Sequence, residues 1–375
     1  MRAAEGAERR LRGSVHALFA FDVGAAVDLA RARELVATPS ASARLLHRHR
    51  APPYFQFTDP PLRLAAEPSQ LAVPGTVGTP MVEVSLYDFG GVTLRYSMSF
   101  EGELEDLVTL ACELSDSELL RTEARQRIAA LAEQIGAAID RPAFAAAFED
   151  YLIFHLEPAA GGRSGPELLR AAPQGLARVL RAERGPLSEA QVNDALQLTA
   201  AYGPMDLVLV DWNGSLVVDT EPADVVAVLE LANLQLLEMR WLDTELDRAL
   251  DTVYALVSRP ASLGARLLPS IGREPLRQVA RMQVDGALLF ERVHNTLKLL
   301  GDPYLARVSR LAGQRFSLAE WNAAVLRKLD ALESVYAKMH DHAAAVRMEL
   351  LEWVIVLLIG VSILMPLLMG SGAGH

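Results

Sequence analysis

Glu291 and His294 are the residues of this sequence whose types and spacing come closest to a metal site. Carboxylate-bridged di-iron bundles use a Glu-x-x-His pair on each of two helices, together with two further glutamates on facing helices. The sequence holds one such pair, and the second pair that a di-iron site needs is missing. We therefore interpret Glu291 and His294 as part of a solvated helix face.

Two histidine pairs are also candidate metal ligands. His340 and His342 stand two residues apart, which places them on different helix faces and makes a shared metal ion unfavourable. We expect them near lipid headgroups instead. His47 and His49 belong to the run RLLHRHR, which is more typical of a basic loop or helix end than of a ligand set. The sequence therefore predicts no metal site and no cofactor.

An acidic stripe is predicted on one helix. Asp243, Asp247 and Asp251 follow i, i+4, i+8 spacing and so share one face. Arg240 and Arg248 are close enough in sequence to pair with them. Such a stripe could bind a cation, but we favour a salt-bridged surface or a contact with another helix.

Other carboxylates lack the partners that catalysis needs. Asp206 and Asp211 flank a predicted hairpin, and Glu149 and Asp150 are adjacent in an aromatic segment. They would form a site only if they converged in a pocket with perturbed pKa values. The glycine-rich loop 158–166 lacks the Gly-Lys-Ser/Thr of a phosphate-binding loop, and neither Gly-x-Ser-x-Gly nor His-Glu-x-x-His occurs. We therefore assign no catalytic residue.

Composition limits the function classes further. The chain has 375 residues, enough for two or three domains, and a formal net charge of −11. That charge argues against broad nucleic-acid binding, because a basic surface is needed to displace counterions. Cys112 is the only cysteine, so neither an internal disulfide nor a cysteine-ligated zinc site can form, and a reducing compartment is indicated.

Three segments are predicted to form β structure. Val15–Phe21 is apolar and partly β-branched. Apolar and polar residues alternate on both sides of an Asp-Phe-Gly-Gly turn, which predicts a hairpin over Thr79–Phe100 with one buried face. A second hairpin is predicted over Met205–Asp219, with Asn213–Gly214 as a two-residue type I′ turn.

Helical spacing dominates the rest of the chain. Leu104–Ile139 is predicted to be largely helical with a break near Ser115–Ser117, and Ser188 is a good N-cap for a later helix. The further predicted helices are Leu168–Ala182, Ser188–Ala200, Ala223–Ser258, Glu274–Leu300 and Asp302–Leu311.

The last helix has the most regular pattern. Its apolar positions alternate between spacings of four and three residues, as in a coiled-coil seam. The seam consists of Val325, Leu329, Leu332, Tyr336, Met339, Ala343, Val346 and Leu350. It could pack antiparallel against Ala223–Ser258, a heptad-patterned segment interrupted by the polar Gln235, or against another copy of the chain. We favour the pairing within the chain.

An apolar stretch, Leu350–Met369, follows directly and carries no charge after Glu352. About 20 helical residues at roughly 1.5 Å each match the roughly 30 Å hydrocarbon core of a bilayer, so a transmembrane helix is predicted. Its anchoring residues are Trp353, Val354, Ile355, Val356, Leu357, Leu358, Ile359, Ile363, Leu364, Leu367 and Leu368. Lys338 and Arg347 precede the stretch and no basic residue follows it, which predicts a cytoplasmic N-terminal part.

The expected fold class is α+β. We expect an α/β domain that contains β-hairpins, then long heptad-patterned helices, then one C-terminal transmembrane helix. The predicted parts are residues 1–157 (N-terminal α+β region), 158–222 (linker helices and second hairpin), 223–349 (coiled-coil-like helical stalk), 350–369 (transmembrane helix) and 370–375 (short tail).

Several stretches together resemble a known family. Val84–Tyr96 reads VSLYDFGGVTLRY, and Leu229–Asp251 reads LELANLQLLEMRWLDTELDRALD. Lys328–Met339 reads KLDALESVYAKM and leads to RMELLEWVIVLLIGVSIL at Arg347–Leu364. This arrangement resembles the YagE-type family, which includes the eukaryotic "required for meiotic nuclear division" proteins. The resemblance implies a membrane-attached scaffold, linked in eukaryotes to organelle membranes and mitochondrial translation, and it implies no catalytic residues.

These observations predict a non-enzymatic membrane scaffold or assembly protein, held by a single C-terminal anchor with its α+β domain in the cytoplasm. Its expected partners are the lipid bilayer and a protein or second copy bound through the helices, with no nucleic acid. The alternative is a membrane-anchored enzyme or small-ligand-binding module, with a site between the α/β part and the helices.

Overall fold

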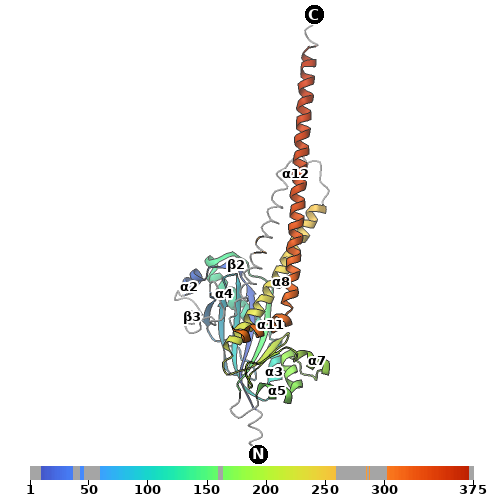
Figure 1. Ribbon diagram of the computed structural model, residues 1–375. Helices are drawn as coiled ribbons and strands as arrows, with labels where there is room; N and C mark the ends of the chain where they lie inside the picture. Colours follow the sequence, from blue (N-terminus) through green and yellow to red (C-terminus); the bar gives the residue numbers. More distant parts are fainter. Residues whose placement is uncertain are drawn as a thin grey trace, which may run out of the picture. The chain divides into compact units, whose positions relative to one another are not determined.

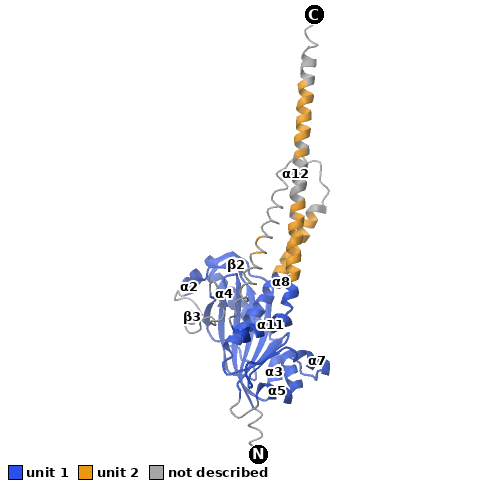
Figure 2. Cartoon of the chain, viewed as in Figure 1, with its two compact units in different colours: residues 1–241, 289–322 blue, residues 242–288, 323–375 orange. Residues whose placement is uncertain are grey.

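The computed structural model describes residues 10–36, 43–45, 60–158, 164–258, 284, 287 and 302–370. Within these ranges, the structure gives only the backbone for some residues. Their side chains are not described at 43–45, 256–258, 336, 339–347, 349–350 and 363–370. The chain forms two compact units (Figure 2). Unit 1 comprises residues 1–241 and 289–322, and unit 2 comprises 242–288 and 323–375.

Unit 1 is built on a nine-stranded sheet (Figure 1). Its strands, in spatial order, are β3 (Ala43–Leu45), β4 (Leu62–Ala66), β5 (Val77–Leu86), β6 (Gly91–Gly102), β1 (Leu11–Asp22), β8 (Phe148–Leu156), β11 (Gly214–Val218), β10 (Leu207–Val210) and β9 (Thr199–Ala200). Neighbouring strands are antiparallel, except that β8 and β11 are parallel. Strands β2 (Gly24–Val27) and β7 (Ile139–Pro142) form a separate pair.

One face of the sheet carries the main hydrophobic core. Alternate residues of β1, including Val15 and Phe19, point into this core because strand side chains alternate between faces. Buried side chains of the helices pack there too. These helices are α2 (Leu29–Val36), α3 (Leu104–Ser115), α4 (Glu118–Gln134), α5 (Gly165–Ala171) and α6 (Pro173–Arg181), with the 3₁₀ turn η1 (Gly136–Ala138). The predicted strand Val15–Phe21 is confirmed as the middle of the longer β1.

The predicted hairpin over Thr79–Phe100 is confirmed as β5 and β6, but the prediction of one buried face is wrong. Val92 and Leu94 enter the main core, and Thr93 on the other face is also buried. The second face is covered by α8 (Ala223–Ser258), whose Glu230 accepts a hydrogen bond from Thr93. Polar alternation near the turn of this hairpin therefore marks a buried polar layer, whereas Met81 and Ser99, farther along the same face, are exposed.

Two helix predictions need correction. The helix expected over Leu168–Ala182 is broken at Ala172 into α5 and α6, because Pro173 has no N–H to continue a helical hydrogen-bond ladder and instead begins the next helix. The helix expected over Ser188–Ala200 ends early, as α7 (Glu189–Ala195). Its predicted cap is confirmed, since Ser188 accepts a hydrogen bond from the Gln191 N–H.

The second hairpin forms as β10 and β11, but its predicted turn is wrong. Val210 pairs with Ser215, and the Asp211 N–H donates to the Gly214 carbonyl at 2.9 Å. The two residues that connect the strands are therefore Trp212 and Asn213. The glycine has a different purpose: a Cβ at Gly214 would lie 2.8 Å from the Leu152 carbonyl oxygen of β8. Close strand approach explains this glycine, and a type I′ turn does not.

Unit 1 also contains α11 (Pro303–Arg315), capped by Asp302, and the first turns of α12 (Leu318–Gly370). The prediction for Asp302–Leu311 is thus confirmed and extended, and α8 has the predicted bounds. The expected helix Glu274–Leu300 lies almost wholly outside the described residues. The predicted boundary at residues 157 and 158 separates no compact units, because β8 and β11 pair in one sheet.

Unit 2 contains the C-terminal part of α8 and most of α12. Lys328 of α12 binds two α8 carboxylates, at 2.6 Å from Asp243 and 2.7 Å from Asp247. Three residues of the predicted seam are buried, namely Val325, Leu329 and Leu332. The structure does not describe the side chains of the other five, which are Tyr336, Met339, Ala343, Val346 and Leu350. Figure 1 shows the two helices running in the same direction, so the expected antiparallel arrangement is wrong.

The apolar end of α12 is exposed in the structure. Side chains of the predicted anchor from Trp353 to Ile359 are between 47% and 68% exposed, and those of Ile363, Leu364, Leu367 and Leu368 lie outside the described ones. Among the residues that the structure describes, no helix combines the length and the apolar character needed to cross a membrane. At the coarse level the fold is as predicted, α+β with an N-terminal sheet domain followed by long helices.

Candidate functional site

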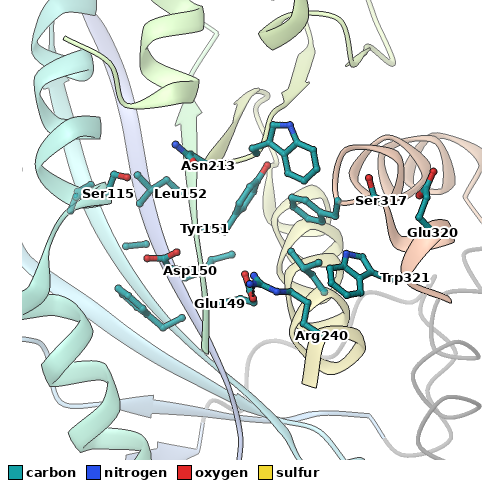
Figure 3. A pocket seen from close by; sticks show the side chains of 17 residues that line it. Ser115, Glu149, Asp150, Tyr151, Leu152, Asn213, Arg240, Ser317, Glu320 and Trp321 are labelled. Carbon is teal, nitrogen blue, oxygen red and sulfur yellow. Dashed lines mark hydrogen bonds and ion pairs between the residues drawn. The ribbon is translucent and has the colours of Figure 1, made fainter. Parts of the chain in front are cut away.

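A cavity of about 730 Å³ opens at one edge of β8 in unit 1 (Figure 3). It is bounded by the start of β8, the turn between β10 and β11, the middle of α8 and the junction of α11 with α12. The side chains that define its chemistry are Glu149, Tyr151, Trp212, Arg240, Phe316 and Trp321.

The cavity exists because β8 is longer than its neighbour. The ladder between β8 and β11 begins where Leu152 pairs with Gly214, and the Leu152 N–H donates to the Asn213 carbonyl at 3.1 Å. Earlier residues of β8 pair only with β1. The segment from Phe148 to Tyr151 therefore has an edge without a strand neighbour, and the cavity lies along it.

The two adjacent carboxylates of β8 lie in the lining but on opposite faces of the strand. Glu149 forms an ion pair with Arg240 of α8, whereas Asp150 lies 3.6 Å from Arg121 of α4. Figure 3 shows Glu149 on the side of Arg240 and Trp321, with Asp150 directed away from them. They do not act as a paired acid and base, because strand alternation separates them.

Burial affects the titration of both carboxylates. Burial raises the pKa of Glu149, with Arg240 opposing that increase and the neighbouring Asp150 adding to it. Burial likewise raises the pKa of Asp150, and Arg121 opposes the increase. Glu149 and Asp150 therefore both line the pocket, and the pKa of each is raised.

Asp211 fixes the turn that forms one wall of the cavity. Its carboxylate is fully buried and pairs with Arg181 at 2.9 Å and with Arg315 at 2.7 Å. Both arginines also contact Asp194 of α7. Because a buried carboxylate is stable when charged partners surround it, Asp211 is a structural link between α6, α7, α11 and the turn, and we assign it no chemical role.

Aromatic rings form the adjoining wall. Tyr151 and Phe316 meet edge to face with ring centroids 5.2 Å apart, and the Tyr151 hydroxyl donates to the Asp211 carbonyl. The guanidinium of Arg315 lies 5.9 Å from the centroid of Trp212. Ser317 follows with a left-handed backbone (φ 52°), which a non-glycine residue rarely adopts and which turns the chain from α11 into α12.

A second cluster of titratable groups lies behind α8. Asp22, at the end of β1, is 4% exposed, and Glu238 of α8 is fully buried. Neither carboxylate oxygen of Glu238 has a hydrogen-bond partner among the described residues. Burial raises the pKa of Asp22 to about 7, although the Gly24 N–H opposes it. Burial, and then the charge of Asp22, raises the pKa of Glu238 well above its usual range. We infer that the pair holds at least one proton at neutral pH.

The same face of the sheet carries further polar contacts to α8. Glu230 accepts from Thr93 and pairs with Arg95 at 3.2 Å, and Arg95 pairs in turn with Glu83 at 2.9 Å. Sequence reasoning noticed Gln235 as the polar residue of α8 but missed Glu230 and Glu238. The signal was present, because both glutamates are flanked by apolar residues within LELANLQLLEM.

Histidines continue this polar face toward the other end of β1. His16 Nδ1 lies 2.9 Å from Ser97 Oγ, and Ser14 Oγ lies 3.1 Å from His16 Nε2 and 3.2 Å from His155 Nδ1. Burial, then the charges of Arg95 and His155, lowers the pKa of His16 to about 3. His16 is therefore neutral at physiological pH and serves as a hydrogen-bonding group.

The other predicted candidates do not join the cavity. Asp206 lies in a loop, where it accepts from the Gly203 N–H. The acidic stripe contacts another helix, as favoured, but through Lys328, while Arg240 and Arg248 pair with the glutamates Glu149 and Glu245. Cys112 is free and half-buried. The residues His47, His49, Glu291, His294, His340 and His342 lie outside the described side chains. Within the described part of the chain, no three His, Cys, Asp or Glu side chains are grouped to hold a metal ion.

The sheet domain defines the family of the chain. Residues 12–224 match the family described as "Uncharacterized protein MJ0711, N-terminal domain", which is more than half of the chain, so the chain belongs to this family. Uncharacterized protein MJ0711 of Methanocaldococcus jannaschii is 26% identical over 194 residues, which is 51% of this chain and 58% of that protein. No solved structure matches the chain. The resemblance to the YagE-type family stays a prediction.

Proposed function

We propose that the protein is a membrane-attached scaffold that holds its sheet domain at a bilayer through the apolar end of α12. The observation that carries this proposal is the exposure of consecutive apolar side chains from Trp353 to Ile359. Consecutive helical residues point in all directions around the axis, so no single packed neighbour could cover them. An apolar surface of this kind requires an apolar environment, and hydrocarbon is the simplest one.

The length and flanks of the segment support insertion. Leu350–Met369 would extend about 30 Å as a helix, which matches the hydrocarbon core. Trp353 stands at its start, where amphipathic rings prefer the interface. Lys338 and Arg347 precede it and favour a cytoplasmic sheet domain.

The helices of unit 2 support a scaffold rather than a simple anchor. Lys328 ties α12 to two carboxylates of α8, and Val325, Leu329 and Leu332 are buried beside them. Such a helical pair gives the segment before the membrane a fixed structure. We propose that its outer surface, or the remaining seam toward Leu350, binds a protein partner or a second copy of this chain.

Flotation on phosphatidylcholine vesicles tests the attachment. The full-length protein should float with the vesicles, and the double variant Ile355→Lys/Leu358→Lys should remain in the load fraction. Each lysine near the centre of a span costs about 3 kcal/mol, so the pair would reduce the partition by more than about a thousandfold. The control variant Ala331→Lys, at an exposed position of α12, should float like the native chain. A native chain that does not float would overturn the proposal.

A second candidate function is a small-ligand-binding module, and the cavity at β8 favours it. The cavity combines a volume typical of ligand sites with aromatic walls and the perturbed carboxylate Glu149. Attachment and ligand binding are compatible, because they use different parts of the chain.

A further inference from the structure

We propose that the cavity at the free edge of β8 binds a small organic cation, an ammonium group carried on an apolar or aromatic body. This inference rests on the second candidate function and does not depend on membrane attachment. Three properties of the cavity select this class of ligand: the faces of its aromatic rings, the balance of its charges and its size.

The aromatic rings offer faces that attract positive charge. Trp212 is 51% exposed, and Trp321, which also lines the cavity, is partly exposed. The electron-rich face of an indole ring attracts cations more strongly than that of any other side chain. The structure already contains one such contact, since the guanidinium of Arg315 lies over the Trp212 ring.

The charges on the side of the cavity lined by Trp321 disfavour anions. On the side of the cavity that Trp321 lines, the charged groups are Glu149, Glu320 and Arg240 (Figure 3). Arg240 pairs with Glu149, which neutralises both. Glu320 is exposed and forms no hydrogen bond or ion pair with a described residue. Its carboxylate therefore leaves this side of the lining with a net negative charge.

The volume and the mixed lining fit a small molecule. About 730 Å³ lies within the range of small-molecule sites, and Leu18, Leu236 and Phe316 supply apolar contacts next to the charged groups. A bare metal ion would leave these apolar surfaces unused. A cation with an organic body would contact the rings, the apolar side chains and Glu320 together.

Three probes with one shared ring test the charge preference directly. Benzyltrimethylammonium, benzyl alcohol and benzenesulfonate are titrated into the full-length protein in a neutral detergent. The chain has four tryptophans, and replacing them with 5-fluorotryptophan gives fluorine NMR signals that single Trp→Phe variants assign. The ammonium probe should shift the signals of Trp212 and Trp321 saturably and at least about tenfold more tightly than the alcohol. The sulfonate should cause no shift, and the signal of Trp241, outside the lining, should not move.

Two substitutions locate the effect. Glu320→Gln should weaken the ammonium probe about threefold to tenfold and leave the alcohol unchanged, because it removes charge and keeps shape. Trp321→Leu should weaken the ammonium probe about fivefold, in line with the loss of one cation–π contact. Glu157→Gln is the matched control, because Glu157 follows the other end of β8, and it should change nothing.

The possible results separate this proposal from the second candidate function. Preferential ammonium binding that depends on Glu320 supports the proposal. Equal or tighter binding of the alcohol or the sulfonate at the same tryptophans overturns the cation class but keeps a ligand site. If none of the three probes shifts Trp212 or Trp321, both the cation site and the ligand-binding function are refuted.

Discussion

Asp22→Asn gives a sharp test of the buried carboxylate pair. Asp22 is 4% exposed, its charge acts on the fully buried Glu238, and burial raises its own pKa from 3.8 to about 7. The folded state therefore holds this proton to a higher pH than the unfolded chain does. The stabilising contribution is complete below about pH 4 and is lost as the pH rises to about 7. Asparagine has nearly the same shape and cannot ionise.

The magnitude follows from the shift. A difference of 7 − 3.8 = 3.2 units, at about 1.4 kcal/mol per unit, gives an upper limit of about 4 kcal/mol. Relative to the native chain, Asp22→Asn should therefore gain up to about 4 kcal/mol of unfolding free energy between pH 4 and pH 8.

Urea denaturation at several pH values, followed by circular dichroism, measures this difference. Subtracting the unfolding free energy of the native chain from that of the variant at each pH cancels the titrations that both proteins share, including that of His16. The companion variant Glu238→Met, which removes the second carboxyl with little change of volume, should also stabilise the fold at pH 8. Parallel stability curves for the native chain and Asp22→Asn would refute a shared, buried proton.

Three further predictions concern packing and titration. Gly91→Ala should destabilise by about 1–3 kcal/mol in thermal denaturation, because its Cβ would lie within 3.0 Å of three side-chain atoms, whereas Gly185→Ala, with open space, should not. Leu332→Asp should cost about 3–5 kcal/mol and expose α12 to hydrogen exchange, whereas Ala331→Asp on the exposed face should have little effect; equal exchange in both would contradict the buried seam. The native chain should lose stability on acidification from about pH 6.5 toward pH 3, because the depressed pKa of His16 makes the folded state resist protonation. In His16→Gln this loss should be smaller. Unchanged acid denaturation would argue against an enclosed neutral His16.

Short sequence patterns were sufficient to predict the elements that are determined by interactions between residues close in the sequence. The hairpin of β5 and β6 follows from alternation around a turn, where Gly90 adopts φ 99°. The cap at Ser188 follows from a side chain that bonds to the backbone three residues later. The bounds of α8 follow from its apolar spacing.

Features that depend on distant strands could not be predicted in this way. The Asn213–Gly214 dipeptide is a strong turn signal, yet the close approach of Leu152 from another strand determines why glycine is needed at Gly214. The polar positions of β6 looked like a solvent face, because no local signal shows that α8 covers them. Thr93 and Arg95 became a buried layer only through pairing with Glu230.

The cavity was foreseen in part. Glu149 and Asp150 were singled out as candidates if they met in a pocket, and both do line it. Their separation onto opposite faces required knowing that the segment is a strand. The contributions of Phe316 and Trp321 depend on the junction of α11 with α12 approaching the edge of β8, and that of Trp212 on the turn between β10 and β11. Sequence spacing does not encode either approach.

The depth of Trp353 in a membrane tests the central claim most directly. A full-length variant with Trp212, Trp241 and Trp321 replaced by phenylalanine leaves Trp353 as the single tryptophan. In vesicles its emission should shift to the blue, and lipids brominated near the headgroup should quench it more than lipids brominated at the chain ends. An emission that stays at the wavelength of a water-exposed indole and is not quenched by brominated lipid would contradict membrane attachment through α12.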